Sequence, residues 1–193
     1  MSLIEEKIKE SIRTKQEVLQ SPELLVSIQQ AADYVCNSLK DEKKILLCGN
    51  GGSASDALHI AGELVGRFQK ERGALAAIAL NADVATLTAI ANDYGYEKVF
   101  ERGVEGLMKE GDCLIGISTS GNSENVYLAI KKAKVLGGKT IAFLGKDGGK
   151  IKNIADISII VPSDCTARIQ ESHIMIGHII CELAEDSYVD GWK

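Results

Sequence analysis

The chain has 193 residues, of which 45% are hydrophobic and 25% charged, and its formal net charge is −5. These values are typical of one globular domain with a sizeable core. Its apolar runs are shorter than the roughly 20 residues of a membrane helix, and its Lys and Arg residues form no basic cluster for nucleic acid. Five cysteines without a CxxC pair, and a charged first segment without the apolar core of an export signal, predict reduced thiols in the cytoplasm.

Helical periodicity begins near the start of the chain. Isoleucines recur every four positions from Ile4, and apolar residues follow a helical period through residues 22–40. Ser21 before Pro22 is a typical helix start, because serine caps free amides and proline fits the first turn. We therefore expect helices over residues 3–20 and 22–40, paired as a hairpin whose spare apolar faces contact other subunits of a homo-oligomer.

Short apolar runs then alternate with helical stretches. The runs lie at residues 45–48, 76–80, 113–117, 141–144 and 157–161. The predicted helices cover residues 53–70, 83–91, 95–109, 123–136 and 166–187. Uninterrupted apolar runs between helices indicate parallel strands that are covered on both faces. We expect a single α/β domain over residues 1–193, with a doubly wound five-stranded parallel sheet in residues 41–193 and the N-terminal helical hairpin in residues 1–40.

A glycine-rich segment follows the first predicted strand, where ligands bind in doubly wound sheets. Glycine permits close backbone approach, and the free amides of the next helix attract phosphate or sugar oxygens. The residues expected to contact a ligand are Asn50, Gly51, Gly52 and Ser53. The alternative is a tight turn in which Ser53 or Ser55 only caps the helix. The spacing is not GxGxxG, which argues against a dinucleotide.

A hydroxyl-rich segment follows the third predicted strand and precedes a helix. Its hydroxyl-bearing residues are Ser118, Thr119, Ser120 and Ser123. Together with free helix amides, these hydroxyls form a neutral phosphate cradle that needs no lysine. A capping turn at Ser120 or Ser123 is the alternative, but it uses only one or two of the hydroxyls. The later segment GKDGG indicates a turn, and we assign it no role.

Two helices carry candidate catalytic side chains. His59 and Glu63 are four residues apart, so they share a helix face, and apolar residues surround them. The last predicted helix carries Gln170, Glu171, His173 and His178. Spacing alone pairs Glu171 with His178 better than it pairs Gln170 with His178. His173 lies on another face of the helix, and we expect it at the surface or in an interface.

Several segments together resemble the sugar isomerase (SIS) domain family and, within it, the phosphoheptose isomerases. They are CGNGGSASDALHIAGELVGRF, AIAND, GISTSGNSENV, GKDGG and ARIQESHIMIGH, and the resemblance extends over residues 20–187. It implies an isomerase that converts sedoheptulose 7-phosphate to D-glycero-D-manno-heptose 7-phosphate. This reaction is the first step of nucleotide-activated heptose synthesis for surface polysaccharide, either lipopolysaccharide or capsule. The implied partners are a phosphorylated seven-carbon sugar and further copies of the chain, expected as a homotetramer, without nucleic acid or membrane.

The resemblance also implies residue roles. The implied ligands of one Zn²⁺ per subunit are His59, Glu63, Gln170 and His178. Besides the two loops, the implied substrate contacts are Glu63, Arg67, Asn92, Asp93 and Gln170. Glu63 is the expected base at carbon, and His178 the acid and base at oxygen, on an enediol(ate) path. Ala167 departs from members that carry an aspartate there, so any role of that acid is absent or supplied elsewhere.

Three alternatives remain at this stage. Asn92 and Asp93 could instead form a turn before Gly95. The chain could be a non-catalytic SIS regulator that binds the replication initiator protein, since ARIQE and LTAIAND also resemble that paralogue. The paralogue lacks the histidine found here at His178 and has an arginine in its serine-rich segment. Finally, the chain could be an SIS isomerase for another phosphosugar.

Overall fold

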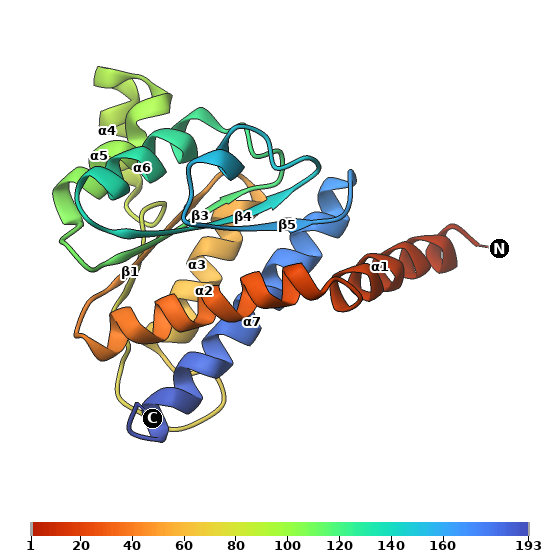
Figure 1. The fold of residues 1–193 in the computed structure, drawn as a ribbon. Helices are drawn as coiled ribbons and strands as arrows, with labels where there is room; N and C mark the ends of the chain where they lie inside the picture. The colour runs from red at the N-terminus through yellow and green to blue at the C-terminus, as the bar shows by residue number, and fades with distance from the viewer. Residues whose placement is uncertain (1, 193) are drawn as a thin grey trace.

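The computed structural model describes residues 2–192 and contains a twisted parallel sheet between two layers of helices (Figure 1). Its strands are β1 (Ile45–Gly49), β2 (Ala77–Ala79), β3 (Cys113–Ser118), β4 (Lys139–Gly145) and β5 (Ile157–Val161). They form one five-stranded sheet in the order β2-β1-β3-β4-β5, and all neighbouring pairs are parallel. The predicted doubly wound sheet is therefore confirmed.

Helices cover both faces of this sheet. They are α1 (Leu3–Leu19), α2 (Pro22–Lys40), α3 (Gly52–Val65), α4 (Val84–Tyr94), α5 (Val99–Leu107), α6 (Glu124–Val135) and α7 (Thr166–Val189), with short 3₁₀ helices η1 (Tyr96–Lys98) and η2 (Ile151–Asn153). Successive strand residues point to opposite faces. Ile45 and Leu47 join the core under α2, α3 and α7, whereas Leu46 and Cys48 join the core under α5 and α6. The central strands are thus apolar on both faces.

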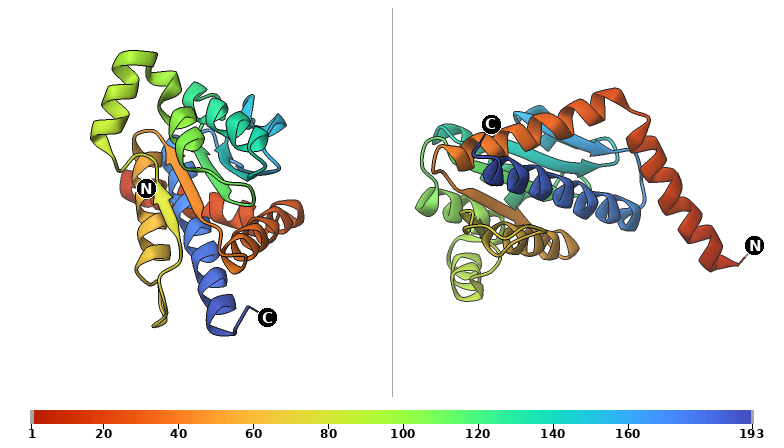
Figure 2. Two further views of the ribbon diagram at one scale, coloured as in Figure 1. Left: turned by 90° about the vertical axis from the view of Figure 1, so that its left-hand side faces the viewer. Right: turned by 90° about the horizontal axis from the view of Figure 1, so that it is seen from below.

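The two N-terminal helices are present but do not form a closed hairpin. Ser21 caps α2 by accepting a hydrogen bond from the amide of Leu24, as the sequence predicts. However, α1 projects away from the sheet and does not fold back along α2 (Figures 1 and 2). Within α1 only Thr14 and Val18 are buried, and its N-terminal isoleucines are half or more exposed. Much of its apolar stripe is therefore exposed to solvent.

Helix α3 ends at Val65, although the sequence predicts a helix to residue 70. Gly66 follows it, and the backbone then turns away from the helical path. The amides of residues 68–70 bind the carboxylate of Glu185 on α7. A tertiary contact thus replaces the last helical turn, which sequence periodicity does not reveal.

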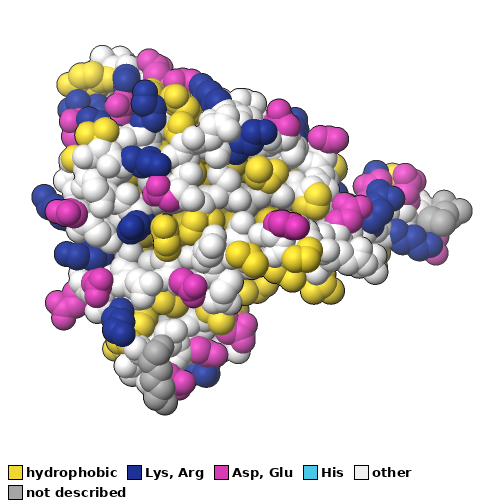
Figure 3. Space-filling view, in the orientation of Figure 1, with side chains coloured by type: hydrophobic (Ala, Val, Ile, Leu, Met, Phe, Trp, Pro, Cys, Tyr) yellow, Lys and Arg dark blue, Asp and Glu magenta, His cyan; other side chains and the backbone are white. Residues whose placement is uncertain are grey.

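Among the described residues 2–192, the helices do not combine the length and hydropathy that crossing a membrane requires. The surface in Figure 3 mixes charged and polar side chains, with hydrophobic side chains gathered where α1, α2 and α7 meet.

Candidate active site

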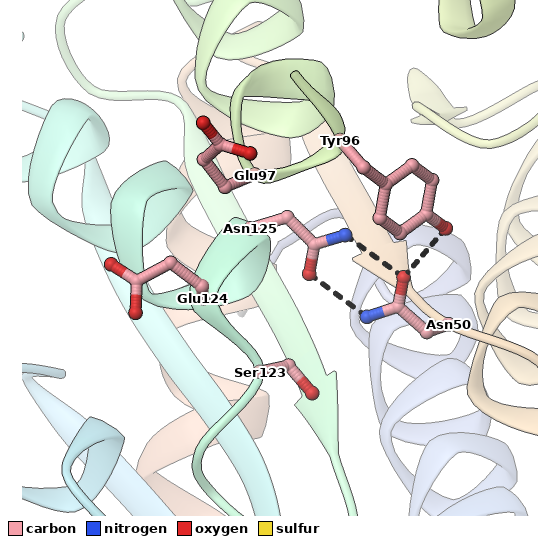
Figure 4. A pocket seen from close by; sticks show the side chains of 6 residues that line it. All are labelled: Asn50, Tyr96, Glu97, Ser123, Glu124 and Asn125. Carbon is pink, nitrogen blue, oxygen red and sulfur yellow. Dashed lines mark hydrogen bonds between the residues drawn. The ribbon is translucent and has the colours of Figure 1, made fainter. Parts of the chain in front are cut away.

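The strand order reverses between β1 and β3, and ligands of doubly wound sheets bind at such a reversal. The glycine loop (residues 49–53) follows β1, and the serine loop (residues 118–123) follows β3. The side chains of Asn50 and Asn125 exchange two amide hydrogen bonds of 2.9 Å (Figure 4). This pair holds the glycine loop to the first turn of α6. Sequence reasoning missed Asn125, which is 3% exposed.

An open pocket of about 380 Å³ lies beside this pair. Its lining residues are Asn50, Tyr96, Glu97, Ser123, Glu124 and Asn125 (Figure 4). The hydroxyl of Tyr96 donates to Asn50 Oδ1 over 2.9 Å, so η1 also fixes the glycine loop. The pocket thus opens at the C-terminal ends of β1 and β3, where the sequence predicts the ligand.

The serine alternatives are only partly correct. The N-cap residue of α3 is Gly51, which has no side chain to cap the helix. The N-cap residue of α6 is Ser123, but among the described residues its side chain makes no capping hydrogen bond. The Oγ atoms of Ser118 and Ser123 instead lie 2.9 Å apart. Ser120 takes the turn role, because its Oγ accepts from the amide of Asn122. The first amides of these helices have other partners: those of Ser53 and Ala54 donate to the carbonyls of Asn50 and Gly51, and that of Val126 donates to Asn125 Oδ1.

The GKDGG turn and the residues after it make hydrogen bonds to the serine loop. The sequence analysis assigned no role to this turn. The amide of Ile151 donates to the carbonyl of Gly121 over 3.0 Å, and the amide of Lys150 to Asn122 Oδ1 over 3.1 Å. Gly149 has a φ of 52°, and a Cβ built there would lie 2.5 Å from the carbonyl of Gly121. The two turns are therefore in backbone contact. The available signal was the paired glycines, which allow such an approach.

On the opposite side of the glycine loop, α3 and α7 pack closely. A Cβ built on Gly177 would lie 2.5 Å from Ile60, so this glycine allows the close approach. His59 Nε2 is 2.9 Å from Glu63 Oε1 and 3.2 Å from His178 Nε2. The three side chains offer ligand atoms that all lie within 4.8 Å of one another. The candidate His59–Glu63–His178 cluster is thus assembled from two helices.

Gln170 is on α7, eight residues before His178. A Cβ built on Gly52 would lie 2.2 Å from Gln170 Nε2, so this amide contacts the glycine loop. Glu171, which spacing alone pairs with His178, instead accepts hydrogen bonds from Ser11 and Arg168. The spacing-based pairing is therefore wrong.

Three further candidates are exposed. Arg67 follows α3, and its guanidinium lies 3.8 Å from the carboxylate of Glu71. Asn92 and Asp93 lie in the last turns of α4, where the Asn92 amide donates to Asp93 over 2.8 Å. Helix α4 packs on η1 and α5, so the structure places this pair on the other face of the sheet from α3 and α7.

His173 is a core residue, which corrects the expected surface or interface position. Its side chain is 0% exposed, and Nε2–H donates to the carbonyl of Leu144 over 2.9 Å. Burial lowers its pKa to about 4, so the imidazole is neutral at pH 7. A second titratable group, missed in the sequence, is Asp56, one turn before His59. Burial raises the pKa of its carboxyl to about 6, against the opposing effect of His59.

A doubly wound sheet with two helix N-termini at its reversal point defines an α/β domain suited to a phosphorylated ligand. The family model described as SIS domain matches residues 8–145. Phosphoheptose isomerase of Clostridium acetobutylicum is 55% identical over 184 residues, covering 95% of this chain and 94% of the relative. That of a Nitratiruptor species is 58% identical, with 96% and 98% covered. The chain therefore belongs to the phosphoheptose isomerases of the SIS-domain family.

A solved structure agrees with this assignment. Phosphoheptose isomerase from Neisseria gonorrhoeae superposes with a TM-score of 0.89 at 45% sequence identity. The match covers 95% of this chain and 97% of the other.

Proposed function

We propose that the protein interconverts sedoheptulose 7-phosphate and D-glycero-D-manno-heptose 7-phosphate. The observation that carries the proposal is the His59–Glu63–His178 cluster, in which a carboxylate and two imidazoles come together from α3 and α7. An aldose–ketose isomerase needs a base for carbon and a second group for oxygen. The relatives named phosphoheptose isomerase supply the substrate class.

In the proposed reaction, Glu63 takes a proton from C2 of the aldose and returns it to C1, which yields the ketose. His178 moves the compensating proton between the two oxygens, so an enediol(ate) forms and collapses without net loss of a proton. The chemistry suits the arrangement because both groups lie in one cluster and remain accessible to solvent. The serine loop would hold the distal phosphate and so fix which carbons face Glu63.

The donor set fits one zinc ion per subunit. Two nitrogens at roughly 2.0–2.1 Å from a tetrahedral zinc are about 3.3 Å apart. The Nε2 atoms of His59 and His178 are 3.2 Å apart, with a Glu63 oxygen beside them. In our proposal, the ligands are these three side chains and Gln170, and the bound ion would polarise the sugar carbonyl. Because a metal-bound carboxylate is a weaker base, Glu63 needs one oxygen free of the metal.

We further propose a homotetramer in which residues 1–40 contact other subunits and residues 41–193 form the catalytic core. A groove of about 510 Å³ supports this assembly, lined by α1, α2 and α7. Arg67, Asn92 and Asp93 would contact the sugar phosphate, and their exposure suits a site that a neighbouring subunit completes. The product would enter the synthesis of nucleotide-activated heptose for a surface polysaccharide. The protein would act in the cytoplasm, where its free thiols stay reduced.

The decisive experiment incubates the purified protein with sedoheptulose 7-phosphate and follows the aldose by proton NMR. The aldose shows an anomeric proton signal, which the ketose lacks because its anomeric carbon bears no hydrogen. Unphosphorylated sedoheptulose and fructose 6-phosphate serve as matched substrates. Turnover of the heptose phosphate alone supports the proposal, and turnover of only the hexose phosphate supports the other-phosphosugar alternative. Binding to the initiator protein without any turnover would support the regulator.

A further inference from the structure

A buried ion pair lies about two turns beyond His178 along α7. Arg72 Nε donates to Glu185 Oε1 over 3.0 Å, and both side chains are 1% exposed. Burying two charges is costly unless further hydrogen bonds satisfy them. Here they do. The Glu185 carboxylate also accepts the amides of Phe68, Gln69 and Lys70, over 2.7 to 2.9 Å.

Arg72 also donates hydrogen bonds to backbone carbonyls at the C-terminal end of α3. Its Nη2 donates to the carbonyl of Glu63 over 2.8 Å, and its Nη1 to the carbonyl of Leu64 over 2.9 Å. The last carbonyls of a helix lack partners within the helix, so a donor from outside fixes their direction. Arg72 therefore holds the helical turn that carries the Glu63 side chain.

Phe68 connects the ion pair to the other catalytic candidate. Its ring stacks on the imidazole of His178, with 5.4 Å between ring centroids and 30° between planes. Its amide is one of those bound to Glu185, which lies two turns beyond His178 on α7. The ring position is thus set by a backbone contact, and the ring in turn limits how the imidazole can rotate.

We propose that Arg72, Glu185 and Phe68 are positioning residues. They hold the side chains of Glu63 and His178 at a fixed distance from each other where α3 packs on α7. The inference rests on the proposed function. Burial works against ionisation of Glu185, but the amides of residues 68–70 and Arg72 outweigh it, so the pKa of this carboxyl lies below its ordinary value. The pair thus stays charged at neutral pH. The glycine and serine loops, which are proposed to hold the phosphate, follow β1 and β3 and are not part of this network, so loosening it should change substrate binding less than it changes catalysis.

The test compares Glu185→Gln and Phe68→Leu with Asp186→Asn as control. Asp186 pairs with Lys70 over 2.6 Å, so it joins the same loop to the same helix, but at the surface. For the two test variants we expect kcat to fall roughly 10- to 100-fold, as for misplaced catalytic groups, with KM changed less than about threefold. The control should keep the kcat and KM of the wild type.

A second readout is independent of turnover. In carbon–proton NMR spectra of the metal-free full chain, the His178 ring signal should shift in Glu185→Gln, which keeps the Phe68 ring, and stay in place in Asp186→Asn. A folded Glu185→Gln variant with an unchanged His178 signal, or a folded Phe68→Leu variant with unchanged kcat, overturns the proposal. If Glu185→Gln does not fold, Phe68→Leu alone decides. If the wild type isomerises no heptose phosphate, the proposed function fails, and the NMR signal still tests the positioning.

Discussion

Glu63 and His178 both contact His59, but their proposed roles differ: Glu63 is the base at carbon, and His178 is the acid and base at oxygen. A glutamine at either position keeps the size of the site but cannot take a proton. We expect Glu63→Gln and His178→Gln each to lower kcat by about 10²- to 10⁴-fold, the usual contribution of general acid–base catalysis. Glu171→Gln on the same helix as His178, outside the cluster, should retain activity.

Deuterium exchange separates these two roles. In heavy water, a variant without the carbon base should stop incorporating deuterium at C1 and C2. Metal content must be measured for each variant, because a lost ion would produce the same loss. Near-normal exchange in Glu63→Gln would show that another residue takes the proton.

His173 makes stability depend on pH. Its pKa is about 4 in the fold and near the ordinary value of 6.5 in the unfolded chain. Between these values the unfolded state binds more protons, so the free energy of unfolding falls as the pH falls from 6.5 to 4, by roughly 3 kcal/mol in full. Urea unfolding of wild type and His173→Gln at pH 7 and pH 5 measures this effect.

The wild type and His173→Gln must be compared at the same pH, because Asp56 changes the free energy of unfolding in the opposite direction as the pH falls. Burial raises the pKa of its carboxyl to about 6, so its protonation favours the fold as the pH falls. The His173→Gln variant should be less stable than wild type at pH 7, with a smaller difference at pH 5. An equal difference at both values would contradict the buried neutral imidazole.

At the scale of elements, the contact between the GKDGG turn and the serine loop predicts an effect at a distance. A methyl group on Gly149 would meet the carbonyl of Gly121 and push the serine loop toward the pocket. Its φ of 52° also disfavours alanine. We expect Gly149→Ala to raise the KM for the sugar phosphate about 10-fold, equivalent to about 1.4 kcal/mol.

Steady-state kinetics with Gly106→Ala as control tests this expectation. A Cβ on Gly106, in α5, meets no atom within 4 Å, so this variant should bind substrate normally. A wild-type KM in folded Gly149→Ala would mean that the turn does not set the serine loop.

The elements also show which features the sequence can predict. Uninterrupted apolar runs predict the strands because both faces of the sheet are buried, and Ser21–Pro22 predicts the start of α2. The end of α3 and the open arrangement of α1 depend on contacts between distant segments, which no local period encodes. In the site, His59 and Glu63 share one helix and were found from spacing. The convergence of His178 depends on the α3–α7 packing, so it came only from the family resemblance.

For the whole molecule, the proposed assembly predicts that disrupting the groove separates subunits. Leu25 is 42% exposed and lines the groove, so Leu25→Glu should leave the fold intact while placing a charge in the proposed interface. Val135→Glu on α6 is the control, because Val135 is 81% exposed and lies outside the groove. Light scattering at micromolar concentration should show tetramers for wild type and control and smaller species for Leu25→Glu. A wild-type monomer would refute the assembly.

The contact between His59 and His178 closes a loop of 119 residues. Loop closure costs entropy, and contacts between distant segments form late in folding. The His59–Glu63–His178 cluster should therefore be absent from the folding transition state. Binding of Zn²⁺ should then slow unfolding while leaving the refolding rate unchanged, because only the native state offers the complete donor set. Stopped-flow unfolding and refolding with and without the ion measure this directly. A bound ion would thus prolong the life of the folded state, so that the lifetime of the folded protein would depend on how fully the proposed metal site is occupied.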